Sequence, residues 1–183
     1  MSLHGITKGT AFEKIVNMMA AGEANGTMMY YSLARLAKEQ GLEDVAAEFI
    51  TAANQEAVHA GFYATLNGKC PQNFWQLLRG VMKVEIKGEA KIMEMAAKFR
   101  EAGLAEAAAE MEVFAKEEGH HGKMLEKILR KYQPELLEDK EGRIYVCSCC
   151  GYEYVGDLAS EDDSYVCPLC GQKKEVFHLK AAQ

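Results

Sequence analysis

The first candidates for chemistry in this chain are two copies of a Glu-x-x-His motif. They are Glu56-Ala-Val-His59 and Glu118-Gly-His-His121. On a helix, residues i and i+3 lie on the same face, so each motif offers one carboxylate and one imidazole to a single metal ion. A lone motif of this kind is usually a solvated pair of neighbours, so the interpretation depends on the second copy.

An internal repeat relates the two copies. A shift of 62 positions superimposes the motifs and pairs Glu23 with Glu85. The same shift pairs further residues: Gly26 with Gly88, Ala34 with Ala96, Gly41-Leu42 with Gly103-Leu104, Ala46 with Ala108. A helical hairpin duplicated in this way builds a four-helix bundle.

The repeat predicts a complete set of metal ligands. Four glutamates and two histidines, distributed in this way over four helices, are the set that holds two iron or two manganese ions in such bundles. Many carboxylates with two imidazoles suit Fe or Mn better than a structural zinc. The predicted ligands are Glu23, Glu56, His59, Glu85, Glu118 and His121. His120 pairs with Glu117 at the same spacing but lies outside the repeat register, so we interpret it as a surface or supporting residue.

A second metal site is predicted near the C-terminal end. Cys147-x-x-Cys150-Gly and Cys167-x-x-Cys170-Gly form two knuckles sixteen residues apart. Four thiolates placed in this way form a tetrahedral site for zinc or iron, and ligand identity alone does not separate the two metals. The remaining cysteines, Cys70 and Cys149, are interpreted as bystanders.

The elements that must position these residues follow from periodicity. Apolar residues at spacings of three and four predict helices over roughly 11–40, 43–66, 74–102 and 105–132, with Pro134 ending the last. From about residue 143 the pattern changes to short β-prone runs around the cysteines, and such a small segment needs a bound metal to fold. The prediction is a mostly α fold: a four-helix bundle over 1–135 and a small β-ribbon over 136–183, with a linker at 133–142.

Composition excludes some classes of function. The 183 residues carry a net charge of −6 and no long basic run, which argues against general nucleic-acid binding. No apolar stretch is long enough to span a membrane, and the first residues do not look like a signal peptide. We therefore expect a cytoplasmic protein.

Taken together, these motifs resemble the rubrerythrin family over nearly the whole chain. The residues that carry the resemblance are Gly22-Glu23 with Tyr30, Glu56-x-x-His59, Glu85, Glu118-x-x-His121, Cys147-x-x-Cys150-Gly-Tyr and Cys167-Pro-x-Cys170. The resemblance implies a ferritin-like di-iron bundle followed by a rubredoxin-like domain with one iron on four cysteines. It also implies roles for the ligands: Glu23 and His59 on one iron, Glu85 and His121 on the other, Glu56 and Glu118 bridging.

The same resemblance implies a function. Such proteins reduce hydrogen peroxide to water, with electrons from NAD(P)H that arrive through a reductase and often a rubredoxin. The four-cysteine iron passes them to the iron pair, usually across the interface of a homodimer, and a carboxylate or Tyr30 helps to move protons. A ferroxidase or O2-reducing oxidase is the first alternative. The second is a non-enzymatic electron carrier, with zinc in the cysteine site.

This sequence departs from the family pattern at two positions. Gly88 stands where rubrerythrins usually carry a further glutamate, although Glu89 is only one residue further along. Ile92 stands where a tyrosine is expected on the third helix. The six-ligand site that remains is nearer to general ferritin-like oxidases, so an oxygen-using or iron-oxidising role stays open beside the peroxidase.

The connection between the hairpins predicts an exchange between chains. In a ferritin-like bundle the second and third helices are parallel, so their connection must return along the bundle. The second helix continues about eleven residues past Glu56, and the third begins about eleven residues before Glu85. At a rise of 1.5 Å per residue, the connection must therefore span roughly 33 Å. The segment from Asn67 to Phe74 spans only about 25 Å when extended. A dimer that exchanges hairpins satisfies this limit, as does unwinding at the end of the second helix.

Overall fold

The computed structural model describes residues 2–70, 73–138 and 143–180. The chain divides into two compact units, Met1–Gln72 and Asn73–Gln183. Pro71 and Gln72, in the connection between the predicted second and third helices, and residues 139–142 of the predicted linker lie outside the described residues.

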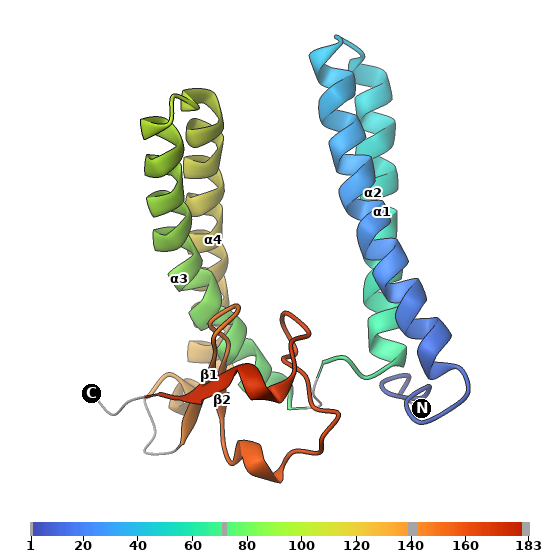
Figure 1. Cartoon of the computed structure of the whole chain (residues 1–183), viewed down its shortest axis with the longest axis vertical. Coiled ribbons are helices and arrows are strands. Elements are labelled where there is room, and N and C mark those ends of the chain that lie inside the picture. Colours follow the sequence, from blue (N-terminus) through green and yellow to red (C-terminus); the bar gives the residue numbers. More distant parts are fainter. Residues whose placement is uncertain (1, 71–72, 139–142, 181–183) are drawn as a thin grey trace. The chain divides into compact units, whose positions relative to one another are not determined.

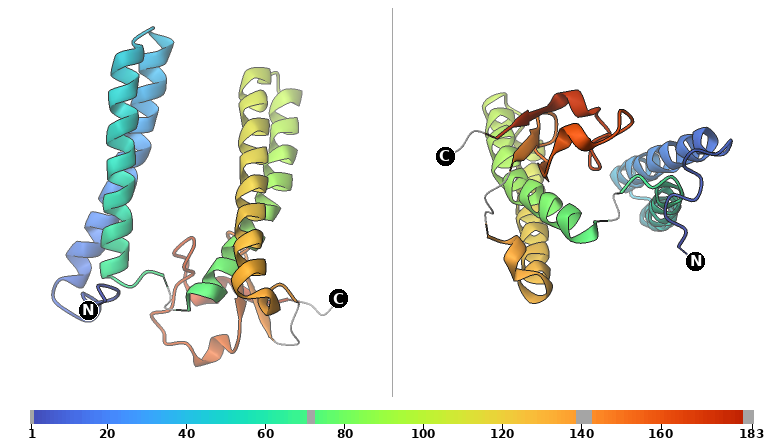
Figure 2. Two further views of the ribbon diagram at one scale, coloured as in Figure 1. Left: turned by 180° about the vertical axis from the view of Figure 1, so that it is seen from behind. Right: turned by 90° about the horizontal axis from the view of Figure 1, so that it is seen from below.

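The first unit is an antiparallel helical hairpin. Its helices are α1 (Glu13–Glu39) and α2 (Glu43–Leu66), which run side by side in Figures 1 and 2. Gly41, at φ 73°, ends α1, and the Leu42 amide donates to the Ala37 carbonyl at 2.9 Å. The left-handed conformation of this glycine lets the amides that follow the helix bond to its last carbonyls, and the chain reverses direction.

The second unit begins with a hairpin of the same design. Helices α3 (Phe74–Glu101) and α4 (Ala105–Tyr132) are joined at Gly103, which has φ 83°, and the Leu104 amide donates to the Phe99 carbonyl at 2.9 Å. Both hairpins close on fully or almost fully buried alanines at matching repeat positions: Ala34 and Ala96, Ala46 and Ala108, Ala53 and Ala115. Small side chains at these positions let the two helices of each hairpin approach closely.

A small ribbon completes the second unit. The 3-10 turn η1 (Pro134–Leu136) leads to a sheet of order β2-β1-β3, built from β1 (Ile144–Cys147), β2 (Glu153–Val155) and β3 (Phe177–Leu179). Both strand pairs are antiparallel. Two further 3-10 turns, η2 (Leu158–Ser160) and η3 (Lys174–Val176), lie in the connection before β3.

The turn that follows α4 packs back on α3 and α4. Leu136 is 7% exposed and packs with Met82 and Leu129, and its carbonyl accepts from Arg79 Nε at 2.8 Å.

The predicted fold class is confirmed: a mostly helical, ferritin-like chain with four long helices, followed by a small rubredoxin-like antiparallel sheet that carries the cysteines. The helix bounds agree with the prediction to within two residues. β1 and β3 overlap the β-prone runs at 143–146 and 175–179, whereas β2 lies outside both runs. Among the described residues, no helix has the length and apolar character needed to cross a membrane.

Candidate metal centres

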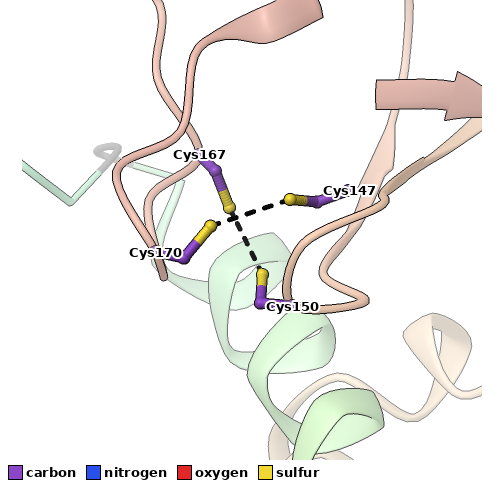
Figure 3. Close-up of side chains that lie close together, drawn as sticks. All are labelled: Cys147, Cys150, Cys167 and Cys170. Atoms are coloured by element: carbon purple, nitrogen blue, oxygen red, sulfur yellow. Dashed lines mark hydrogen bonds between the residues drawn. The ribbon is translucent and has the colours of Figure 1, made fainter. Parts of the chain in front are cut away.

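Four cysteine sulfurs converge in the ribbon (Figure 3). Cys147 Sγ lies 3.7 Å from Cys170 Sγ, and Cys150 Sγ lies 3.6 Å from Cys167 Sγ. A tetrahedron with metal–sulfur bonds of about 2.3 Å has sulfur–sulfur edges of about 3.8 Å. The spacing therefore fits one tetrahedral metal ion, and none of the six cysteines forms a disulfide.

The two knuckles repeat the same backbone pattern. The amides of Gly151 and Gly171 each donate at 2.8 Å to the carbonyl of the first cysteine of their knuckle, Cys147 and Cys167. Both glycines have positive φ, 82° and 73°, which other residues rarely adopt. This tight turn brings the two sulfurs of each knuckle onto one side.

Backbone amides point toward the sulfurs and favour the thiolate form. Burial raises the pKa of Cys170, but the amide of Gln172 and neighbouring thiols outweigh it and lower that pKa to about 7. Burial is also the main reason why the pKa of Cys167 rises to about 11. A buried cluster of thiols with such opposed shifts suits a metal ion, because a bound cation deprotonates all four. Cys70 and Cys149 are exposed and are not among the four grouped cysteines.

The first unit holds one half of the predicted carboxylate–histidine set. Glu23 comes from α1, and Glu56 and His59 come from α2, one turn apart. His59 Nδ1 lies 3.6 Å from Glu23 Oε2 and 3.7 Å from Glu56 Oε2. The two carboxylates are about one quarter exposed, while the imidazole is 55% exposed. We call these three residues the first half-site.

The second unit holds the matching set. Glu85 comes from α3, and Glu118 and His121 come from α4. His121 Nδ1 lies 3.4 Å from Glu85 Oε2, and the exposed fractions of these side chains, 56% and 23%, nearly equal those of the first half-site. We call these residues the second half-site. In each half-site one ligand atom per residue lies within 4.8 Å of the others, which is close enough to share an ion.

The electrostatics of the half-sites favour a cation. The hydrogen bond with Glu56, together with burial and the Glu56 charge, raises the pKa of Glu23 above its usual range. Burial, followed by the hydrogen bond and charge of Glu118, does the same to the pKa of Glu85. Glu85 Oε2 is also buried without a hydrogen bond within the described part of the chain. Crowded carboxylates with an unsatisfied oxygen are what a metal ion would neutralise.

Two further candidate residues lie on helices that carry half-site ligands. Tyr30 lies two turns after Glu23 on α1, and its ring packs against Phe49 of α2 with centroids 6.1 Å apart. His120 is exposed, in agreement with its interpretation as a surface residue.

Gly88, which stands where the family usually has a glutamate, lies close to the second half-site. A Cβ on Gly88 would lie 3.6 Å from Glu118 Cβ, so a side chain at this position would run beside the second half-site. The Glu89 carboxylate instead lies over Gly119, where an added Cβ would approach Glu89 Oε2 to 2.2 Å. Glu89 is not among the grouped ligands of this half-site. The sequence did not predict the contact between Glu89 and Gly119. Its available signal was the repeat, in which Ala57 of the first hairpin is replaced by a glycine at position 119.

Comparison with known proteins places the chain in a family. The Rubrerythrin family model matches residues 14–74. An uncharacterized protein of Methanocaldococcus jannaschii is 34% identical over 128 residues, which cover 70% of this chain and 91% of that protein. The rubrerythrin of Porphyromonas gingivalis is 27% identical and covers 93% of this chain and 90% of its own length. The chain belongs to the rubrerythrin family.

A putative rubrerythrin of M. jannaschii shows 26% identity over 92% of this chain and 93% of that protein. The solved structure of nigerythrin in its mixed-valence state is 20% identical, covers 98% of this chain and 94% of nigerythrin, and has a TM-score of 0.31.

Family membership identifies an oxidoreductase whose cofactors are an iron pair and a single iron on four cysteines. The residues present fit these cofactors. The four sulfurs have tetrahedral spacing, and each half-site offers two carboxylates and one imidazole.

Proposed function

We propose that this chain is a di-iron peroxidase that reduces hydrogen peroxide to water and receives its electrons through the four-cysteine iron centre. The observation that carries the proposal is the matched pair of half-sites, each with two glutamates and one histidine in the same repeat register. When bound, the iron pair supplies the two electrons that, with two protons, convert H2O2 into two molecules of water.

The residues of the half-sites have three tasks in this reaction. Glu23 with His59 and Glu85 with His121 would each hold one metal ion, and Glu56 and Glu118 would be the carboxylates shared by the pair. A half-site carboxylate or the Tyr30 hydroxyl delivers protons to the departing oxygen atoms. The ligand glutamates are about one quarter exposed, whereas the two imidazoles are more than half exposed.

Electrons enter at the ribbon. We propose that a reductase oxidises NAD(P)H and reduces the four-cysteine iron, directly or through a rubredoxin. Cys150 and Cys170 are partly exposed, and Val166 and Leu169 beside them are more than one third exposed, which offers an apolar surface to such a donor.

A comparison of two oxidants tests the peroxidase proposal. Iron-loaded, fully reduced protein is mixed without oxygen with hydrogen peroxide, and separately with air-saturated buffer. The return of ferric absorbance is then timed. We expect peroxide to react faster by orders of magnitude. An equal rate with oxygen would contradict the proposal.

One observation favours a second candidate, a ferroxidase or O2-reducing oxidase. Gly88 leaves open the position beside Glu118 where a further carboxylate would run. A site with six ligands is closer to general ferritin-like oxidases, and the equal rate described above is the result this candidate predicts. Colourless protein with zinc in the cysteine site and no iron pair would instead support a carrier without catalysis.

We also propose a homodimer in which the hairpins exchange between chains. The helix bounds support it: α2 continues to Leu66 and α3 begins at Phe74, so the connection spans at most about 25 Å against the roughly 33 Å that a parallel α2 and α3 require. A monomer by light scattering at micromolar concentration would contradict this assembly.

Complementation separates exchange from an ordinary dimer. One chain carries Glu56→Ala with His59→Ala, and a differently tagged chain carries Glu118→Ala with His121→Ala. In an exchanged heterodimer the two intact half-sites meet, so co-expressed chains should regain one active iron pair. No recovery in a purified heterodimer would contradict exchange.

A further inference from the structure

The ribbon packs on one face of α3 within the second unit. Residues at spacings of three and four form this face: Leu77, Gly80, Val84, Lys87 and Lys91, with Lys83 beside them. Leu77 and Val84 pack against the buried cluster of Cys147, Tyr152 and Cys167. In Figure 3 the green ribbon of α3 passes directly beside the four cysteines. We call this set of α3 residues the docking face.

The centre of the docking face is a charged clamp. Glu153, the first residue of β2, is 2% exposed and accepts hydrogen bonds from Lys83 Nζ at 2.8 Å and Lys87 Nζ at 3.0 Å. Lys180 of the ribbon adds a third at 3.2 Å. Burial alone would raise the pKa of Glu153, but the two α3 lysines outweigh it and lower that pKa to about 2. Glu153 is the buried member of this cluster, whereas its lysine partners are 19–47% exposed, so loss of the two α3 lysines leaves a buried carboxylate with Lys180 as its remaining partner in the cluster.

Close packing surrounds the clamp. The Tyr152 ring lies on Gly80, where an added Cβ would approach a ring carbon to 2.2 Å. At the far end of the face, a Cβ on Gly151 would lie 3.8 Å from Lys91 Nζ. The contact therefore extends from Leu77 to Lys91, along three to four turns of α3.

The internal repeat shows that this face is specific to the second hairpin. At the matching positions α1 carries Met18 for Gly80, Ala21 for Lys83, Asn25 for Lys87 and Met29 for Lys91. The space for Tyr152 and the two lysines of the clamp are thus absent from the first hairpin. In contrast, the ligand positions match at every residue of the two half-sites.

We propose that the docking face fixes the four-cysteine centre beside its own chain's second half-site, and that Glu153 is the positioning residue for electron delivery to that half-site. Val84 packs against the cysteine cluster and directly precedes Glu85 on α3, so the cysteine cluster contacts a residue next to a ligand of the second half-site. Each transfer oxidises the four-cysteine iron by one electron and reduces the iron pair by one. A one-electron donor of the reductase or rubredoxin class restores the former. The inference rests on the proposed function.

The test uses Glu153→Gln in the full chain. Glu94→Gln is its matched control, because Glu94 forms an exposed ion pair with Lys98 on α3. In the zinc-loaded protein we expect hydrogen exchange of residues 77–91 and 150–156 to accelerate at least about tenfold in Glu153→Gln, since a buried charged partner is lost, and to stay unchanged in Glu94→Gln. Unchanged exchange in Glu153→Gln would contradict the docking role.

A kinetic measurement tests electron delivery. Fully reduced, iron-loaded protein is mixed with hydrogen peroxide, and reoxidation of the iron pair and of the red four-cysteine centre are followed separately. We expect Glu153→Gln to leave the first phase unchanged and to slow the second at least about tenfold. Absence of the first phase in the wild type would contradict the proposed function. A normal first phase with an unslowed second phase in Glu153→Gln would contradict this inference alone.

A second variant covers the case in which Glu153→Gln disturbs the ribbon itself. Lys83→Gln with Lys87→Gln opens the clamp from the helix side and leaves the Glu153–Lys180 pair in place. The spectrum of the ferric four-cysteine site reports that the ribbon is intact. With that spectrum unchanged, a slowed second phase supports the inference and an unslowed one contradicts it.

Discussion

The two hairpins of this chain agree on one face and differ on another. The six ligands, the two turn glycines and three pairs of buried alanines all recur after 62 positions. On the docking face of α3, a glycine and two lysines replace Met18, Ala21 and Asn25 of α1. A duplicated hairpin thus keeps its metal-binding side, while one copy acquires a surface for the ribbon that follows it.

The largest expected effect tests whether the half-sites are equal. His59→Ala and His121→Ala each remove one imidazole from a matched set, so we expect both to lower iron-pair occupancy or the peroxide rate by at least about 100-fold. Iron content and stopped-flow kinetics measure the effect. A variant that keeps two irons and full activity would show that the hairpins have different roles.

Acid should destabilise the docking face through Glu153. The pKa of Glu153 falls from 4.5 to about 2 in the folded chain, which corresponds to roughly 3 kcal/mol of stability. Because the folded pKa is the lower one, this stability is present above pH 4.5 and is lost as the pH falls toward 2. The thermal unfolding midpoint of the metal-loaded wild type should therefore fall more over this pH range than that of Glu153→Gln. Equal dependence of the two midpoints on pH would contradict the clamp.

Gly80→Ala should weaken the packing between the ribbon and α3. The added Cβ would overlap the Tyr152 ring, and overpacking of this kind costs about 1–3 kcal/mol. Gly61→Ala on α2 is the control, since its added Cβ has no neighbour within 4 Å and should stabilise the helix by up to about 1 kcal/mol. Equal unfolding midpoints for the two variants would be inconsistent with the docking face.

The smallest expected effect concerns the third-helix departure. Gly88→Glu places a carboxylate beside Glu118, at a position that the first hairpin also leaves as a glycine, Gly26. We expect the ratio of the peroxide rate to the oxygen rate to rise by less than about tenfold, or 1.4 kcal/mol of barrier. A fall in this ratio would argue that the additional carboxylate does not favour peroxide.

Much of the fold could be predicted because its signals are local. Gly41 and Gly103 mark the two hairpin turns, and the Glu-x-x-His motifs mark two ligand faces that the repeat register makes specific. The cysteine knuckles carry their own turn glycines. In each case the residues that act together are close in the sequence or are related by the repeat.

The docking face could not be predicted in the same way. Glu153 meets its lysine partners from a three-residue strand about 70 positions along the chain, and a strand this short has no periodicity to detect. The available signal was the break in the repeat at Gly80, Lys83 and Lys87. Its meaning depends on a partner that only the three-dimensional structure supplies.

The central claim is that the two half-sites together hold one iron pair, and iron counting with Mössbauer spectroscopy tests it most directly. The chain is loaded with enriched iron and oxidised. We expect three irons per chain: one in the four-cysteine site and two in a magnetically coupled ferric pair. A single uncoupled iron per half-site, or one iron per chain in total, would contradict it.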